Sequence, residues 1–187
     1  DPKDKILAIY PGSRQQEVKQ HLSIIIKALE KIILELPGLK VILGKAPSVK
    51  IDDIPDYIKI ESENPQLALQ NANAAMIASG TASLESAVLD IPMVVFYRFN
   101  SLTWFIAKRM ANVKYACIVN LIVNKMLVPE FIQNEMTADN LAKAITPLLN
   151  NTSTRKNMLL GYDQIRRTLG IPGVYDRAAE AIMKRLT

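Results

Sequence analysis

Residues 5–38 read KILAIYPGSRQQEVKQHLSIIIKALEKIILELPG, and this stretch decides the fold class. The run from Lys5 to Tyr10 has the length and the apolar content of a buried strand. After a Pro-Gly-Ser-Arg turn, the segment from about Glu17 to Leu36 repeats leucine and isoleucine on one helical face, and Pro37-Gly38 ends it. A buried strand that leads at once into a long amphipathic helix is the unit from which parallel α/β sheets are built.

The same alternation continues along most of the chain. Further strands are predicted at Lys40–Leu43, Tyr57–Ile60, Ala74–Ala78, Pro92–Tyr97 and Tyr115–Val119. Helices are predicted at about Pro65–Asn71, Ala82–Asp90, Leu102–Met110, from a cap at Thr137 onward, Thr152–Leu169 and Gly173–Leu186. The sequence therefore predicts a Rossmann-like, doubly wound parallel sheet of about six strands, with flanking helices and a helical carboxyl-terminal portion.

Size and composition favour one globular domain, residues 1–187. The chain is 49% hydrophobic and 22% charged, and no Pro/Gly/Ser-rich linker divides it. Its longest apolar runs fall well short of the roughly 20 residues that a membrane-spanning helix needs. The chain opens with neither an initiator methionine nor a signal sequence, so we expect a piece of a longer protein.

The charge and the ligand-type residues exclude some classes of function. A net charge of +5 suits a phosphate-bearing ligand or an anionic membrane surface, and equally ordinary solubility. The basic residues are scattered and form no dense stripe, so nucleic-acid binding is not expected. The single histidine, His21, has no cysteine or histidine neighbours in the sequence. We therefore predict no metal site and no cofactor.

The loop after the first predicted strand is the first candidate site. Its turn, Gly12-Ser13-Arg14, allows backbone N–H groups to face an anion at the helix amino terminus, and Arg14 can fork onto phosphate oxygens. A tight turn with a solvated arginine is the equally good alternative for this segment by itself.

A second loop of the same kind reads ASGTASLE at residues 78–85. Ser79–Thr81 forms another anion-accepting turn, and Glu85 can accept two ribose hydroxyls through its paired oxygens. The alternative is a capping box in which Thr81 or Ser83 starts the helix. Two such turns on one sheet, one with an arginine and one with a carboxylate, predict a nucleoside diphosphate site. Neither carries the glycine pattern of a dinucleotide-binding loop.

A third loop holds Asn120, which follows the last predicted strand and is expected to point into the same cleft. Its amide can hold phosphate or sugar oxygens, although a residue that simply ends the strand fits as well. Glu130 fits the first turn of a helix that begins at Pro129. The predicted nucleotide-binding residues are Gly12, Ser13, Arg14, Ser79, Gly80, Thr81, Ser83, Glu85 and Asn120.

Taken in order, the motifs resemble the lipid A disaccharide synthase family. They are YPGSRxxE at residues 10–17, ASGTASLE at 78–85, PMVVFYR at 92–98 and VNLI at 119–122. The resemblance extends from Ile6 to the end of the chain. In the wider group of two-domain sugar-nucleotide transferases with related motifs, the glutamate corresponding to Glu85 holds ribose. Residue pairs 9–10 and 118–119 depart slightly from the usual pattern.

The resemblance implies the donor-binding half of an inverting GT-B glycosyltransferase. Such an enzyme joins UDP-2,3-diacylglucosamine and 2,3-diacylglucosamine 1-phosphate through a β-1,6 linkage and releases UDP. Arg14 and Asn120 would stabilise the leaving group. The catalytic base and the acceptor site would lie in an amino-terminal domain that this chain lacks, so no catalytic base is predicted here. The implied location is peripheral, at the cytoplasmic face of the inner membrane.

Several expectations stay open. Another UDP-sugar enzyme, such as a cell-wall glycosyltransferase or a non-hydrolysing epimerase, and a non-catalytic nucleotide-binding module are the competing interpretations. Residues 170–187 form a terminal helix that can contact the absent domain or be exchanged between the copies of a homodimer. Trp104, Phe105, Lys108 and Arg109 share one predicted helix, where they either rest on an anionic membrane or pack inward with snorkelling cations.

Overall fold

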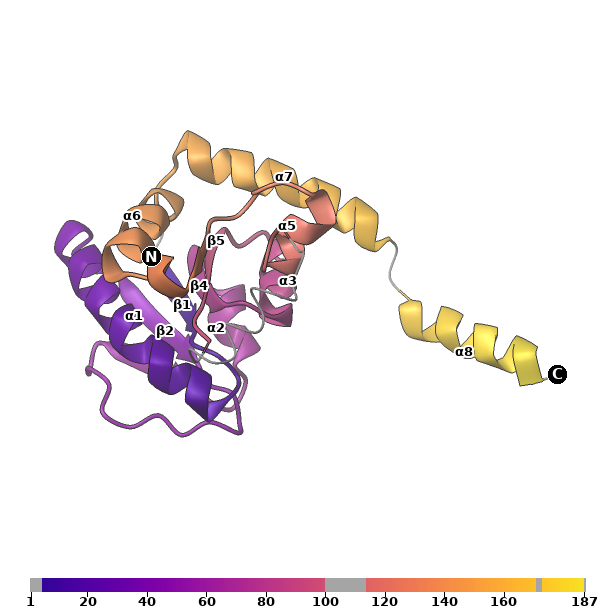
Figure 1. Ribbon diagram of the computed structural model, residues 1–187, viewed down its shortest axis with the longest axis horizontal. Helices are drawn as coiled ribbons and strands as arrows, with labels where there is room; N and C mark the ends of the chain where they lie inside the picture. The colour runs from indigo at the N-terminus through magenta and orange to yellow at the C-terminus, as the bar shows by residue number, and fades with distance from the viewer. Residues whose placement is uncertain (1–4, 100–113, 171–172, 187) are drawn as a thin grey trace.

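The computed structural model describes residues 5–99, 114–170 and 173–186. Its centre is a six-stranded parallel sheet in the order β3-β2-β1-β4-β5-β6 (Figure 1). The strands are β1 (Ile6–Tyr10), β2 (Lys40–Gly44), β3 (Ile58–Glu61), β4 (Ala74–Ala78), β5 (Met93–Tyr97) and β6 (Glu130–Ile132). The order runs outward in both directions from β1 and β4, so the topological switch point lies between these two strands.

The helices cover both faces of the sheet. They are α1 (Gln15–Glu35), α2 (Gln66–Gln70), α3 (Thr81–Val88), α5 (Ile118–Val123), α6 (Ala138–Leu149), α7 (Ser153–Leu169) and α8 (Val174–Leu186), with a short 3₁₀ turn at Gln133–Glu135. Figure 1 shows α1 and α6 on one side of the sheet and α3 on the other. The core consequently lies in two layers, one on each face of the sheet.

Burial explains why the strand sequences are almost continuously apolar. Every residue of β4 is buried, as are the first four residues of β5, because helices cover both faces of the central strands. In α1 the buried positions Ile25, Leu29 and Ile32 recur at helical spacing, as the sequence predicted, and Ala28 is buried with them. The predicted doubly wound α/β fold is confirmed.

The predicted helix starts in the carboxyl-terminal portion are also confirmed. The Thr137 hydroxyl accepts a hydrogen bond from the Asn140 backbone N–H at 3.2 Å, and Thr152 caps α7 in the same way through Arg155. These caps satisfy backbone donors that the first helical turn leaves without intrahelical partners.

The sixth strand lies elsewhere than predicted. Residues 115–117 are irregular and Ile118–Val123 forms α5, so the predicted strand Tyr115–Val119 is wrong. The run is apolar because Cys117 and Val119 are buried in the core, and a short buried run does not distinguish a strand from a helix. The edge strand β6 begins at Glu130, so the predicted helix start at Pro129 is wrong too. The predicted helix Leu102–Met110 lies outside the described residues.

Candidate functional site

A cavity of about 650 Å³ opens at the carboxyl ends of β1 and β4, beside the switch point. Tyr10 and Ile77 are register partners in adjacent strands, so the turns that follow the two strands lie at the same edge of the sheet. The structure thereby brings six of the predicted residues to one cavity: Gly12, Ser13, Arg14, Ser79, Gly80 and Thr81. The volume is in the range of small-molecule sites.

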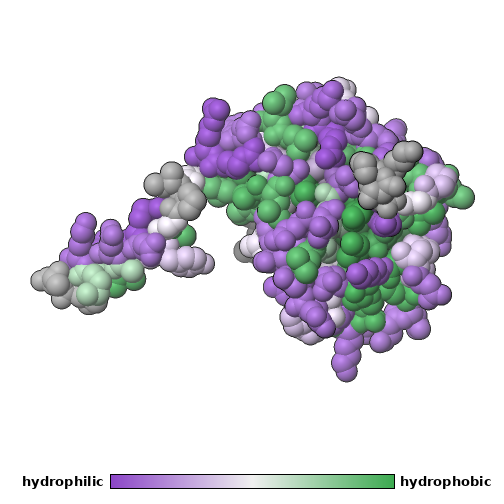
Figure 2. Space-filling view, turned by 180° about the vertical axis from the view of Figure 1, so that it is seen from behind, coloured by the Kyte–Doolittle hydropathy of each residue, from purple (hydrophilic) through white to green (hydrophobic). Residues whose placement is uncertain are grey.

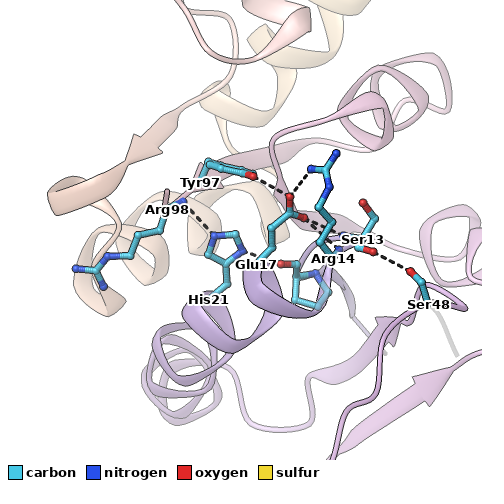
Figure 3. A network of polar contacts seen from close by, with 8 residues as sticks. Ser13, Arg14, Glu17, His21, Ser48, Tyr97 and Arg98 are labelled. Atoms are coloured by element: carbon cyan, nitrogen blue, oxygen red, sulfur yellow. Dashed lines mark hydrogen bonds and ion pairs between the residues drawn. The ribbon is translucent and has the colours of Figure 1, made fainter. Parts of the chain in front are cut away.

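The first turn is organised around the carboxylate of Glu17. Its Oε2 accepts hydrogen bonds from the backbone N–H groups of Ser13 (3.1 Å) and Arg14 (3.3 Å). Its Oε1 accepts bonds from Arg14 Nη1 and from the Tyr97 hydroxyl, both at 2.7 Å (Figure 3). The backbone N–H groups of Ser13 and Arg14, which were expected to face a bound anion, are therefore already hydrogen-bonded to the Glu17 carboxylate.

Burial and hydrogen bonding act in opposite directions on the acidity of this carboxyl. Burial raises the pKa of Glu17, but hydrogen bonds from Tyr97, from the Arg14 guanidinium and from the two amides outweigh it, so the pKa lies below its ordinary value. For Tyr97, burial and then the bond to Glu17 raise the pKa to about 12. The pair consists of an ionised carboxylate and a neutral phenol at neutral pH.

His21 links the same turn to the end of β5 through both of its ring nitrogens. Its Nδ1 lies 2.7 Å from the Pro11 carbonyl oxygen, and its Nε2 lies 3.0 Å from the backbone N–H of Arg98 (Figure 3). Because that N–H is a donor, Nε2 accepts and Nδ1 carries the proton, which defines a neutral ring. Burial lowers the pKa of this fully buried histidine and favours that state. The single histidine is a structural tie between two strand ends.

The second turn is open by comparison. Gly80 is the N-cap of α3, and no described side chain caps this helix. Ser79 continues the β4–β5 pairing through its backbone N–H to Phe96, and its hydroxyl donates to the Ala116 carbonyl at 3.0 Å. The first backbone N–H groups of α3 border the cavity at Thr81 and Ala82, where a helix amino terminus favours an anion.

Ser83 does not reach the cavity, which corrects the predicted nucleotide contact. Its side chain is fully buried and its hydroxyl donates to the Gly80 carbonyl at 2.7 Å. The hydroxyl is therefore committed to the shape of the turn.

Glu85 lies one turn into α3, and it lines a neighbouring hollow of about 410 Å³ that shares Thr81 with the main cavity. It is half-buried, and its charge contributes to the environment of the Tyr10 hydroxyl. Burial, followed by this carboxylate, raises the pKa of Tyr10 to about 12. Glu85 thus lies near the cavity without lining it.

Asn120 is not in the cleft, contrary to expectation. It is fully buried in α5, where its Nδ2 donates to the Val128 carbonyl (2.8 Å) and to Glu130 Oε1 (2.6 Å). Its Oδ1 accepts from the backbone N–H groups of Leu127 and Val128 at 2.8 and 2.9 Å. All the capacity of the amide serves to hold the segment that leads into β6.

The sequence analysis missed one wall of the cavity. Tyr10, Gly44 and Pro65 line it, and the Tyr10 hydroxyl donates to the Pro65 carbonyl. A Cβ on Gly44 would lie 2.8 Å from Tyr10 Cζ, so only glycine allows the ring to lie there. The available signal was that these residues stand at or after strand ends, where ligands bind in such sheets.

The described residues offer neither a metal cluster nor a membrane-spanning helix. In residues 5–99, 114–170 and 173–186, no group of three or more metal-ligating side chains is close enough to hold an ion. No helix in those same ranges is long and apolar enough to cross a membrane. Trp104, Phe105, Lys108 and Arg109 lie outside the described residues.

Comparisons with known proteins give one consistent family. A family model for lipid-A-disaccharide synthetase matches residues 1–182. The lipid-A-disaccharide synthase of Myxococcus xanthus is 32% identical over 96% of this chain and 49% of its own length. That of Rhodospirillum centenum is 32% identical over 100% of this chain and 49% of its own length. The chain therefore spans about half the length of the curated relatives it matches.

Solved structures are similar in fold at low sequence identity. The calicheamicin glycosyltransferase CalG4 has a TM-score of 0.63 and 15% identity, covering 100% of this chain and 43% of that one. The kitacinnamycin glycotransferase has a TM-score of 0.60 and 19% identity, covering 96% and 43%. These similarities show the fold, and this chain covers less than half of each of those two chains.

Proposed function

The chain belongs to the lipid-A-disaccharide synthase family, and from that premise we propose that it is the carboxyl-terminal, nucleotide-sugar-binding half of a two-domain glycosyltransferase. The whole enzyme transfers 2,3-diacylglucosamine from its UDP conjugate to 2,3-diacylglucosamine 1-phosphate, with inversion, and releases UDP. The observation that carries the proposal is the cavity beside the switch point, between the Arg14 guanidinium and the uncapped amino terminus of α3.

The geometry supports two kinds of donor to the diphosphate, one from each turn. Sugar transfer leaves negative charge on the departing UDP, and preorganised donors that meet this charge lower the barrier. We assign the diphosphate to the Arg14 guanidinium on one turn and the α3 backbone N–H groups on the other. We assign the ribose hydroxyls to Glu85, which lines the neighbouring hollow that shares Thr81 with the cavity. Asn120 takes no direct part in this proposal, because all the hydrogen-bonding capacity of its amide is used by Leu127, Val128 and Glu130.

This half supplies binding and leaving-group stabilisation. An inverting transfer also needs a base on the acceptor hydroxyl, and we assign that base and the acceptor site to the amino-terminal half. The chain by itself is therefore expected to bind UDP but to show no sugar-transfer activity.

The terminal helix α8 is the proposed contact with that half. It projects away from the sheet (Figure 1), and residues 173–185 are all exposed. Figure 2 shows hydrophobic and hydrophilic residues on opposite sides of it. Exposed apolar surface of this kind marks an interaction site. Exchange of the helix between the copies of a homodimer is the alternative arrangement.

Because both sugars carry acyl chains, we place the enzyme peripherally on the cytoplasmic face of the inner membrane.

Calorimetric titration of the chain with UDP and with uridine tests the nucleotide site. UDP should bind, and at 100 times its dissociation constant it should add about 2.7 kcal/mol to the free energy of unfolding. Arg14→Ala should weaken UDP about tenfold and leave uridine unchanged, because uridine has no phosphate. Glu85→Ala should weaken both ligands.

The exposed Glu35→Gln, at the far end of α1, is the matched charge control. The proposal is overturned if the unmodified chain binds neither ligand, or if Arg14→Ala lowers the affinities for UDP and uridine equally.

A further inference from the structure

Among the residues that the structure describes, Glu17 is the one buried carboxylate that lines the cavity, and the proposed chemistry does not use it. It lies on α1 with 9% of its surface exposed, at the point where a phosphate would bind if the first turn were an open anion site. Its role therefore decides which groups of the first turn remain available to the diphosphate.

The backbone of the turn is shaped around this side chain. Gly12 has φ = +131°, and a Cβ there would lie 2.7 Å from Glu17 Oε2 and 2.8 Å from Glu17 Cβ. Only glycine tolerates both the backbone conformation and the approach of the carboxylate. The glycine is thus explained by an internal anion, without any need for a bound one.

The same carboxylate restrains Arg14. The Arg14 side chain is 77% exposed, whereas that of Glu17 is 11% exposed, so the partner that is fixed in place is the glutamate. Glu17 is itself held by the Tyr97 hydroxyl from the end of β5 (Figure 3). A guanidinium has five N–H donors, and the bond to Glu17 uses one of them. The remainder can reach a ligand while the group stays tethered.

We propose that Glu17 is a positioning residue. Its carboxylate occupies the backbone N–H groups of Ser13 and Arg14, and it orients the Arg14 guanidinium toward the diphosphate. The phosphates then bind to that guanidinium and to the backbone N–H groups at the start of α3. The Ser13 and Arg14 backbone N–H groups, in the turn after β1, take no part. This inference rests on the proposed UDP site and deepens it. It assigns the two turns different kinds of phosphate contact.

A double-mutant cycle with two ligands tests the role. Glu17→Gln keeps the size of the side chain and removes the ion pair, so Arg14 must lose rotamer freedom when it binds phosphate. We expect UDP affinity to fall about three- to tenfold, as for the ordering of one long side chain. Uridine affinity should be unchanged. In an Arg14→Ala background, Glu17→Gln should have no further effect on UDP, because Glu17 acts through Arg14.

Glu35→Gln, the same change elsewhere on α1, should leave both affinities unaltered. Tyr97→Phe removes one bond to Glu17 without changing the charge, and it provides a second test if Glu17→Gln fails to fold. It should weaken UDP about twofold, again only when Arg14 is present.

Three results would overturn the inference while UDP binding by the unmodified chain leaves the proposed function standing. Tighter UDP binding by Glu17→Gln would mean that the carboxylate competes with the diphosphate for the turn. An equal loss for uridine would mean a general structural effect. A loss that persists without Arg14 would mean that Glu17 acts by another route. Absence of UDP binding in the unmodified chain would instead remove the proposed function itself.

Discussion

The turn after β1 and the turn after β4 both lead from a buried strand into a helix at the same edge of the sheet. In the first, the backbone N–H groups of Ser13 and Arg14 are paired with the carboxylate of Glu17. In the second, Gly80 is the N-cap of α3 and no described side chain caps the helix. Equivalent positions in a fold therefore differ in what they can bind, because a helix start that holds its own anion is not free to hold another.

The largest expected effect separates the two glycines of these turns. Gly12→Ala forces a Cβ onto Glu17 at positive φ and should lower the free energy of unfolding by about 3 kcal/mol. Gly80→Ala meets only the Ala78 carbonyl oxygen at 3.9 Å, in extended backbone, and should change it by about 0.5 kcal/mol or less. Urea denaturation measures both. Equal losses would contradict the view that only the first turn is built around a side chain.

Proline at the first residue of α3 or of α1 compares what the backbone N–H groups of the two helix starts contribute to UDP binding. Proline is accepted there and removes the N–H. Relative to Thr81→Ala, Thr81→Pro should weaken UDP binding about tenfold through loss of a bond to a charged group. The Gln15 side chain exchanges two hydrogen bonds with the Lys50 backbone, so Gln15→Pro is compared with Gln15→Ala, and relative to that variant it should leave UDP affinity unaltered. If Gln15→Pro were as damaging as Thr81→Pro, the two turns would share the phosphate equally.

The smallest effect is the pH dependence of stability. The folded-state pKa of Glu17 is lowered, so its stabilising contribution is complete above the ordinary pKa near 4.5 and is lost as the pH falls through the lower folded value. Between about pH 5 and pH 3, the unmodified chain should lose about 1 kcal/mol more than Glu17→Gln, the usual contribution of a helix cap. Urea denaturation across that range measures the difference, and parallel curves for the two proteins would contradict it.

Local pattern was sufficient for most of the fold. The apolar runs of β1 and β4 and the helical repeats of α1 and α7 each record the burial of their own residues, so sequence alone placed them. It failed between Tyr115 and Val119, where an apolar run is a loop and a helix, and at β6, a three-residue edge strand whose residues are only half-buried. Short segments carry too few residues to display a period.

The site divides in the same way. Six predicted residues line the cavity because the ends of adjacent parallel strands must meet at one edge, which follows from the α/β pattern itself. Ser83 and Asn120 carry the right functional groups, but their partners, Gly80 in one case and Val128 and Glu130 in the other, use those groups internally. Whether a polar side chain faces a ligand or the core is set by packing.

The sequence by itself determined the class of fold, the two turns and the chemical groups they carry, since these depend on neighbours within a few residues. Only the tertiary structure decided that Glu17 is paired with Tyr97, 80 positions away, and that the two turns therefore offer different groups to a ligand. Hydrogen-bond capacity is finite, and how it is shared among distant residues is settled only when the strands that carry them are brought side by side.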